Sequence, residues 1–224
     1  MNNWVAVVLL LVIVLAAGLL RERWRVSRIE GWARASGFTR RFPVPPEGPQ
    51  PAAVMVSRLS VHGARIWGLL LDGTIDGAAV TIAEHESSEP AKKTGVWHTI
   101  VTWPIADAGG SIFMQRGTGS RAVARAAEAI IGAVKRPMAD ALGLSIGDAA
   151  STVETPGGWV VGGDPIVRDR WLTPEKMREL DAWAHGGEFV REDGFGAWRL
   201  RELTSVDALT RLIEQLPAAR RLLQ

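Results

Sequence analysis

An uninterrupted apolar run at the N-terminus is the sequence feature that most restricts this chain. No charged residue occurs from Met1 to Leu20, and the seventeen residues from Trp4 to Leu20 are almost all aliphatic. Folded as an α-helix, this run would be about 26 Å long, close to the thickness of the hydrocarbon core of a bilayer. The sequence therefore predicts a transmembrane anchor over residues 1–20.

Arginines follow the apolar run directly and predict its orientation. Positively charged flanks tend to stay in the cytoplasm, so we expect a single-pass protein of the cell membrane with its N-terminus outside and its C-terminal domain in the cytoplasm. A cleaved signal peptide is the alternative, and it would place an exported domain behind residues 16–18, which are small. Signal peptides carry basic residues before the apolar run, whereas this chain begins with the uncharged Met1, Asn2 and Asn3.

Residues 21–41 form a basic juxtamembrane segment. Residues 21–60 contain eight arginines and three acids, whereas residues 61–224 contain 18 basic and 21 acidic side chains. This imbalance predicts that the segment contacts the lipid bilayer and its anionic headgroups. The alternative is that the helix simply continues into the domain. The residues expected at the membrane interface are Trp4, Arg21, Arg23, Trp24, Arg25, Arg28 and Trp32.

Composition excludes several classes of site. The chain has no cysteine, which excludes disulfides, thiolate zinc sites, iron–sulfur clusters and cysteine nucleophiles. The formal net charge is only +2, and the pI near 9.5 reflects the abundance of arginine and the absence of tyrosine and cysteine. We therefore expect no nucleic-acid partner and no cofactor.

The soluble part reads as an α+β domain with a mainly antiparallel sheet. Five prolines between Pro43 and Pro51 predict a Pro-rich linker over residues 42–54, which leaves a globular domain over residues 55–224. Alternating β-branched and aromatic residues predict strands at 64–71, 78–86 and 96–105, followed by shorter strands at 111–116, 151–154, 159–162, 188–192 and 197–201. Asp76-Gly77 and Asp193-Gly194 are typical hairpin turns.

Two to three helices are expected to pack on this sheet. Thr173 and Pro174 have the residue types of an N-cap and a first helical position, and Ser205 caps a last helix that Pro217 should kink or end. A further helix is expected from Ser120, where apolar residues recur at helical spacing up to position 134.

Candidate ligand groups are few. Gly117, Gly119, Ser120 and Arg121 at a helix start offer amides, a hydroxyl and a cation to an anion, although the spacing matches neither a Walker loop nor a dinucleotide fingerprint. His85 and His98 lie on neighbouring predicted strands, but strand histidines more often face solvent than bind a metal. No hydrolase or kinase signature occurs, so we expect a protein that is not an enzyme.

Several stretches resemble a loosely defined set of bacterial single-pass membrane proteins with a short N-terminal anchor and an α+β domain. They are residues 32–38, the aromatic strand 98–105, the Gly-Asp turn 158–164 and the capped helix start 171–174. The resemblance implies the fold but supplies no activity and no catalytic residue. We favour a non-enzymatic binding or scaffold module with an unknown protein partner. An enzyme or an anion-binding domain is the alternative.

Overall fold

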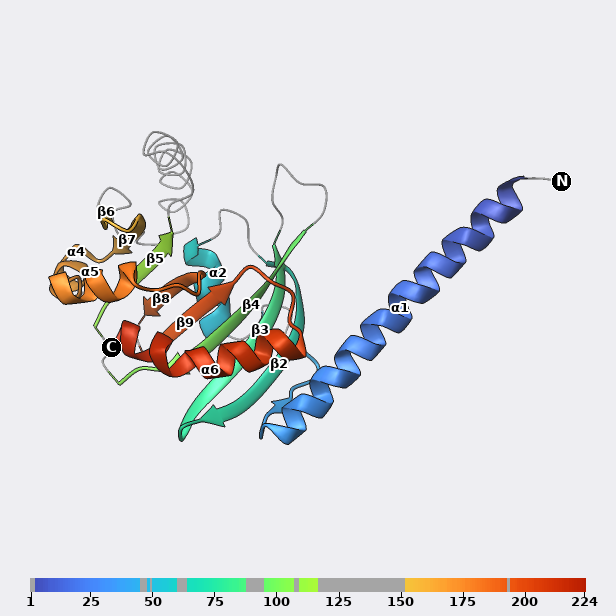
Figure 1. Cartoon of the computed structure of the whole chain (residues 1–224), viewed down its shortest axis with the longest axis horizontal. Coiled ribbons are helices and arrows are strands. Elements are labelled where there is room, and N and C mark those ends of the chain that lie inside the picture. The colour runs from blue at the N-terminus through green and yellow to red at the C-terminus, as the bar shows by residue number, and fades with distance from the viewer. Residues whose placement is uncertain are drawn as a thin grey trace.

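The chain folds into a long N-terminal helix and an α+β domain. The computed structural model describes residues 3–44, 48, 50–59, 64–87, 95–106, 109–116, 152–192 and 194–224. Helix α1, Asn3–Ala35, projects far out of the domain at its N-terminal end and lies against it at its C-terminal end (Figure 1). A helix over the apolar run is confirmed, and it continues fifteen residues beyond Leu20 without a break.

A nine-stranded sheet forms the centre of the domain, with strand order β1-β2-β3-β4-β9-β8-β5-β7-β6 and antiparallel pairing throughout. This confirms the predicted α+β class with a mainly antiparallel sheet. The strands are β1 Thr39–Arg40, β2 Ala64–Ile75, β3 Ala78–Ser87, β4 Val96–Pro104, β5 Ile112–Arg116, β6 Val153–Glu154, β7 Trp159–Gly163, β8 Glu188–Glu192 and β9 Phe195–Leu200.

Both predicted hairpins form. Asp76 and Gly77 join β2 to β3 with φ angles of 50° and 75°, which is the left-handed backbone that a two-residue hairpin of this type needs. At the second hairpin β8 pairs with β9 in antiparallel register up to Glu192 and Phe195. The turn residues thus set the strand registers locally.

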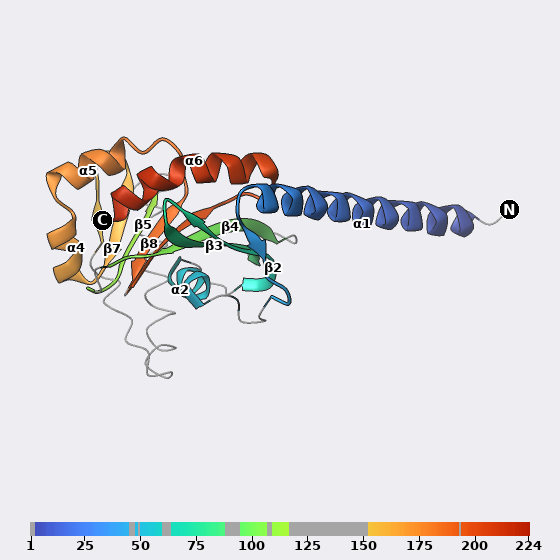
Figure 2. The ribbon, with the colours of Figure 1, turned by 90° about the horizontal axis from the view of Figure 1, so that it is seen from below.

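Helices cover both faces of the sheet. Figure 2 shows α6, Val206–Leu223, on one face and α2, Gln50–Leu59, on the other. The short helices α4, Pro165–Trp171, and α5, Pro174–Asp181, lie at the end of the domain far from α1. The predicted caps are confirmed, because the Lys176 amide donates to Thr173 and the Ala208 amide donates to Ser205.

Two helical features differ from the sequence prediction. Asp164, expected in a turn, caps α4 by accepting bonds from the amides of Ile166 and Val167. Helix α6 continues through Pro217 to Leu223, so Pro217 does not end the helix, which was one of its two expected effects. Residues on both sides of Pro217 are buried in the core, so packing holds the helix together where proline removes a backbone donor.

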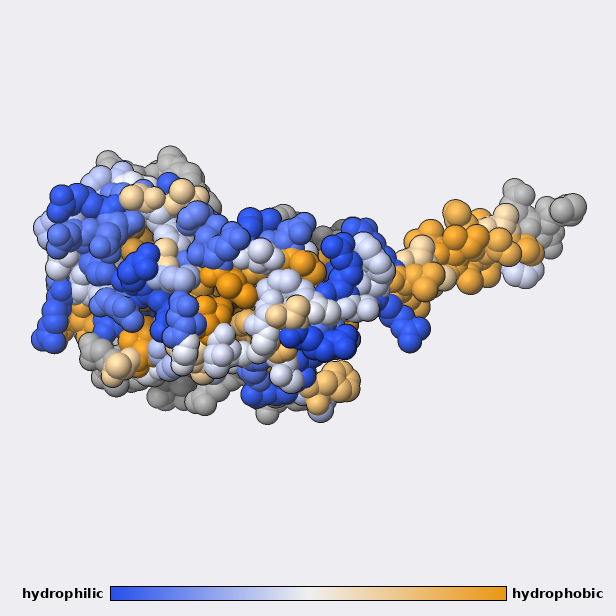
Figure 3. Space-filling view, turned by 60° about the horizontal axis from the view of Figure 1, so that its bottom comes forward, coloured by the Kyte–Doolittle hydropathy of each residue, from blue (hydrophilic) through white to orange (hydrophobic). Residues whose placement is uncertain are grey.

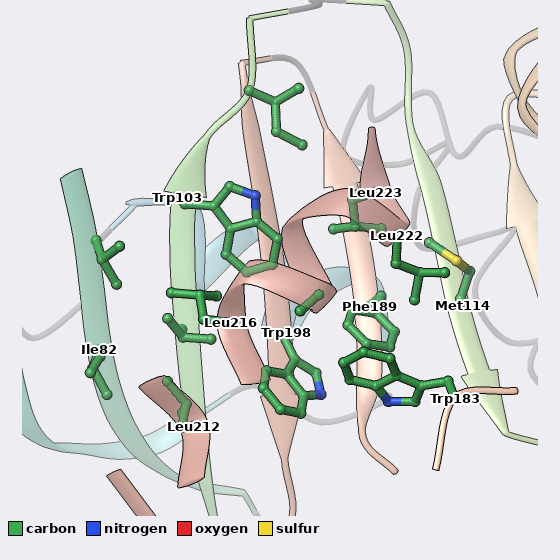
Figure 4. Packing of buried hydrophobic residues seen from close by; sticks show 14 of the residues in the cluster. Ile82, Trp103, Met114, Trp183, Phe189, Trp198, Leu212, Leu216, Leu222 and Leu223 are labelled. Carbon is green, nitrogen blue, oxygen red and sulfur yellow. The ribbon is translucent and has the colours of Figure 1, made fainter. Parts of the chain in front are cut away.

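The larger hydrophobic core lies between the sheet and α6. Figure 4 shows Trp103, Trp183, Phe189 and Trp198 converging with leucines of α6. Phe189 stacks on Trp198 with ring centroids 5.9 Å apart, and Trp183 meets Trp198 edge to face at 5.4 Å. A smaller core beneath α2 contains Met55, Leu70 and Ile100 on the opposite face of the sheet. Tryptophan therefore fills core positions in a chain without tyrosine.

The packed domain includes segments that the sequence assigns to the juxtamembrane region and the linker. Ile29, Ala33 and Phe38 are buried in the larger core, and β1 pairs with β2. Helix α2 begins at Gln50, inside the expected linker. The structured unit thus starts within residues 21–41, because three apolar side chains among the arginines are enough to attach this segment to the domain.

Candidate functional site

The apolar half of α1 has the surface of a membrane helix. The helix from Trp4 to Ala35 contains an 18-residue window with a mean hydropathy of 2.7, none of which is buried in the structure. Figure 3 shows it as a hydrophobic rod outside a domain whose surface is largely hydrophilic. A core helix of similar composition would be covered, so this exposure suggests membrane anchoring. A signal sequence passes the same test of length and composition, so the distinction depends on how the C-terminal half of α1 is joined to the domain.

A buried ionic clamp joins this half of α1 to the domain. Arg25 Nη1 donates to Glu84 Oε1 on β3 and to the carbonyl oxygen of Thr204, each at 2.8 Å. Arg25 Nη2 reaches the second oxygen of Glu84 at 3.1 Å. The amide of Thr204, just before α6, also donates to Glu84 Oε1 at 3.0 Å. One carboxylate thus joins α1, β3 and the loop that leads into α6.

The clamp joins a buried carboxylate to a partly buried guanidinium group. The Glu84 side chain is only 1% exposed, and the Arg25 side chain is 17% exposed. Burial alone would lower the pKa of Arg25, but hydrogen bonds and charge attraction from Glu22 and Glu84 outweigh it and raise that pKa. The hydrogen bond from Arg25 in turn lowers the pKa of Glu22. Breaking such a pair by removing one partner typically costs about 3–5 kcal/mol, because it leaves the other charge buried and unpaired.

The structure divides the residues expected at the membrane interface into two groups. Trp4, Arg21, Arg23, Trp24 and Arg28 are exposed, and the Arg28 guanidinium lies 4.8 Å from the ring centroid of Trp24.

Arg25 and Trp32 instead face the domain. Arg25 forms the clamp, and Trp32 stacks on Phe38 with ring centroids 5.7 Å apart and packs against the core. Positions 25, 29 and 33 follow a helical spacing of four, so one side of α1 serves the domain while the other stays exposed. Trp32 is therefore partly buried against the domain, and its expected place at the membrane interface stays a prediction.

A cavity of about 420 Å³ opens beside α6. Its cationic and imidazole groups are Arg201, Arg211 and His185, and Arg211 donates to the neighbouring Glu202 at 3.1 Å. Two guanidinium groups, those of Arg201 and Arg211, thus line the cavity, and guanidinium groups commonly bind anionic ligands. The full lining is His185, Gly187, Leu200, Arg201, Glu202, Ala208, Arg211, Leu212 and Gln215. These residues come from three separate segments, so no local motif in the sequence could reveal the cavity.

The two strand histidines are buried and stacked. His85 on β3 pairs directly with His98 on β4, and their rings are nearly parallel with centroids 4.9 Å apart. Burial and nearby cations lower the pKa of His85 to about 3 and that of His98 to about 4. In the part of the chain that the structure describes, neither ring nitrogen of His85 has a hydrogen-bond partner. Within the same ranges, no group of three or more His, Asp or Glu residues is placed to hold a metal ion.

The anion site expected at Gly117, Gly119, Ser120 and Arg121 lies outside the described residues, as does the helix expected after it. That site stays a prediction. The structure supplies the cavity beside α6 as a second place where arginines could receive an anion.

Comparison with known proteins identifies a similar fold. No family model and no curated protein matches the chain. Among solved structures, the chain is similar to the crystal structure of the mycobacterial trehalose monomycolate transport factor A, TtfA. The identity is 12% and the TM-score 0.54, and the match covers 88% of this chain and 93% of that chain. This likeness shows the fold, an α+β domain.

Proposed function

We propose that this chain is a single-pass membrane protein whose C-terminal domain is a non-enzymatic binding or scaffold module at the inner face of a bacterial membrane. One observation carries the proposal: α1 runs without a break from an exposed apolar surface into the core of the domain, and Arg25 fixes it there. A signal sequence does not need to be connected to the domain in this way, because it is cleaved. A module that must hold a defined position above the bilayer needs such a connection.

The arginines behind the apolar run support a cytoplasmic domain. Arg21, Arg23 and Arg28 are exposed around the point where α1 would leave the bilayer. The solved structure with a similar fold is titled a transport factor. We therefore propose that the partner is a protein that works in transport at the membrane, and that the domain binds it without catalysing a reaction.

Reporter fusions and cross-linking test this proposal. A cytoplasmic reporter fused after Gln224 should be active and a periplasmic reporter silent, with the chain retained at full length. Neutralising Arg21, Arg23 and Arg28 together should weaken this orientation, since they supply the positive flank. The reverse reporter pattern, or a shortened chain, would overturn the proposed topology.

Cross-linking addresses the partner. In native membranes the full-length protein should be captured with an integral membrane protein of a transport system. The Arg25→Ala variant, still in the membrane but with a loosened domain, should capture less of it. Equal capture by both proteins would show that the clamp does not serve the partner.

The cavity beside α6 favours a second candidate function, the binding of an anionic ligand. A ligand that binds only the folded state raises the melting temperature, and the increase grows with the logarithm of the ligand concentration once that concentration exceeds the dissociation constant. Inorganic phosphate should therefore raise the melting temperature of the full-length protein in detergent, and Arg211→Gln should reduce the increase. Arg170 on α4 is exposed and does not line the cavity, so it offers the matched control Arg170→Gln. No response to phosphate, or the same response in all three proteins, would exclude this function.

A further inference from the structure

One exposed leucine lies in the loop that contacts the C-terminal half of α1. The loop between β9 and α6, residues 201–205, contains Leu203, whose side chain is 42% exposed. Its neighbour Thr204 is buried and is bound to Arg25 of α1 through its carbonyl oxygen. In Figures 1 and 2 the start of α6 lies beside α1, so this loop faces the anchor from the domain side.

Helix geometry places this loop at the level of the lipid headgroups. Arg25 follows Leu20 by five residues, which is about 7.5 Å along the helix axis. The headgroup layer extends about 5–7 Å beyond the hydrocarbon core on each side. Side chains on a helix lean toward its N-terminus, which for α1 is the membrane side, so Arg25 meets Thr204 closer to the bilayer than its own backbone. Leu203 is therefore within reach of the bilayer surface.

The charges around the loop match an anionic surface. Arg201 in the loop and Arg21, Arg23 and Arg28 on α1 are exposed. Of the acids near the loop, Glu22 and Glu84 bind Arg25 and Glu202 accepts a bond from Arg211, whereas Asp207 in the first turn of α6 is exposed. Exposed arginines near an anionic leaflet are attracted to its headgroups.

We propose that the β9–α6 loop is a second membrane contact, in which Leu203 enters the headgroup layer and Arg201 binds the anionic headgroups beside it. The occupant is the lipid surface into which α1 is inserted, so this inference depends on the proposed anchoring. With α1 it gives the domain two points of attachment. The clamp at Arg25 holds these two points together and so fixes the tilt of the domain above the bilayer.

Site-directed spin labelling tests this contact, because the chain has no cysteine of its own. Nitroxides would be placed singly at Leu203→Cys, Ile166→Cys and Leu11→Cys in the full-length protein, reconstituted into vesicles of phosphatidylcholine with phosphatidylglycerol. The readout is the ratio of relaxation by oxygen, which enters lipid, to relaxation by a water-soluble nickel chelate. Ile166 is the matched control, since it is also an exposed apolar residue but lies on α4 far from α1.

We expect a ratio at position 203 several-fold higher than at position 166 and below that at position 11. The ratio at position 203 should fall as the salt concentration rises, because salt screens the charges. It should also fall in the Arg201→Gln variant and in vesicles of phosphatidylcholine alone, because each of these changes removes charges from the contact. If the ratio at position 203 equals the ratio at position 166 while the label at position 11 lies in lipid, the loop does not contact the membrane, although the anchor does. A label at 11 that is in water contradicts the anchor itself. Equal ratios in neutral and anionic vesicles overturn the role of anionic headgroups.

Discussion

At the scale of single residues, the ion pair between Glu84 and Arg25 is expected to contribute strongly to the stability of the domain. Glu84 is a buried carboxylate whose cation comes from a helix 59 residues earlier in the chain. Arg25→Ala should therefore lower the free energy of unfolding by about 3–5 kcal/mol, because the carboxylate would stay buried without a cation. Denaturant unfolding of the full-length protein in detergent measures this change.

A matched control and a rescue make the Arg25 experiment specific. Arg23→Ala removes an exposed arginine two residues away and should change the unfolding free energy by less than about 0.5 kcal/mol. Replacing Arg25 and Glu84 together by leucine should recover much of the loss, since apolar pairs commonly substitute for buried ion pairs. Equal losses in Arg23→Ala and Arg25→Ala would show that the clamp does not stabilise the domain.

The stacked histidines predict a pH dependence of stability. His85 and His98 have pKa values of about 3 and 4 in the folded state, against an ordinary value of 6.5. Below pH 6.5 the unfolded chain therefore binds protons that the folded chain refuses, so stability must fall with falling pH. The slope approaches about 1.4 kcal/mol per pH unit for each histidine until the folded values are reached.

Chemical denaturation between pH 7 and pH 5.5 measures this slope before most carboxylates titrate. The His85→Phe variant should show a shallower slope than the wild type, because only one of the two buried histidines remains to titrate. If the free energy of unfolding stays constant over this interval, the prediction is wrong, and the His85 and His98 side chains are accessible to water in the folded protein.

At the scale of elements, the sequence predicted the turns and helix caps, which depend on residues close together in the chain. Asp76-Gly77 gives a two-residue hairpin, and Thr173 and Ser205 cap helices, because turn and cap chemistry act within three residues. The same logic was available for Asp164 and Pro165 at the start of α4, where an acidic cap precedes proline. The cap was missed because the adjacent glycines favoured a turn.

Elements joined across long sequence distances could not be predicted in this way. The continuation of α1 into the core depends on Ile29, Ala33 and Phe38, three apolar residues in a segment whose arginines dominate its composition. The clamp joins residues 25, 84 and 204, and the cavity collects residues 185–215 from three segments. Only the tertiary fold brings these groups together, so the clamp and the cavity could not be predicted from periodicity or local motifs.

At the scale of the whole molecule, α1 is both the proposed membrane anchor and an element of the domain. Its N-terminal half is exposed and apolar, and its C-terminal half contributes Ile29 and Ala33 to the larger core. A flexible linker would let the domain rotate freely above the membrane. A continuous helix with a buried clamp instead transmits the direction of the anchor to the sheet, which suits a module that presents one face to a partner.

The distance between the anchor and the domain tests this central claim most directly. Nitroxide pairs at Leu15→Cys on α1 and Glu214→Cys on α6, both at exposed positions, would be measured by pulsed electron resonance in the full-length, membrane-reconstituted protein. The account predicts one narrow distance distribution that broadens when Arg25→Ala is added. A broad distribution in the protein with Arg25 intact would contradict it, because anchor and domain would then move independently.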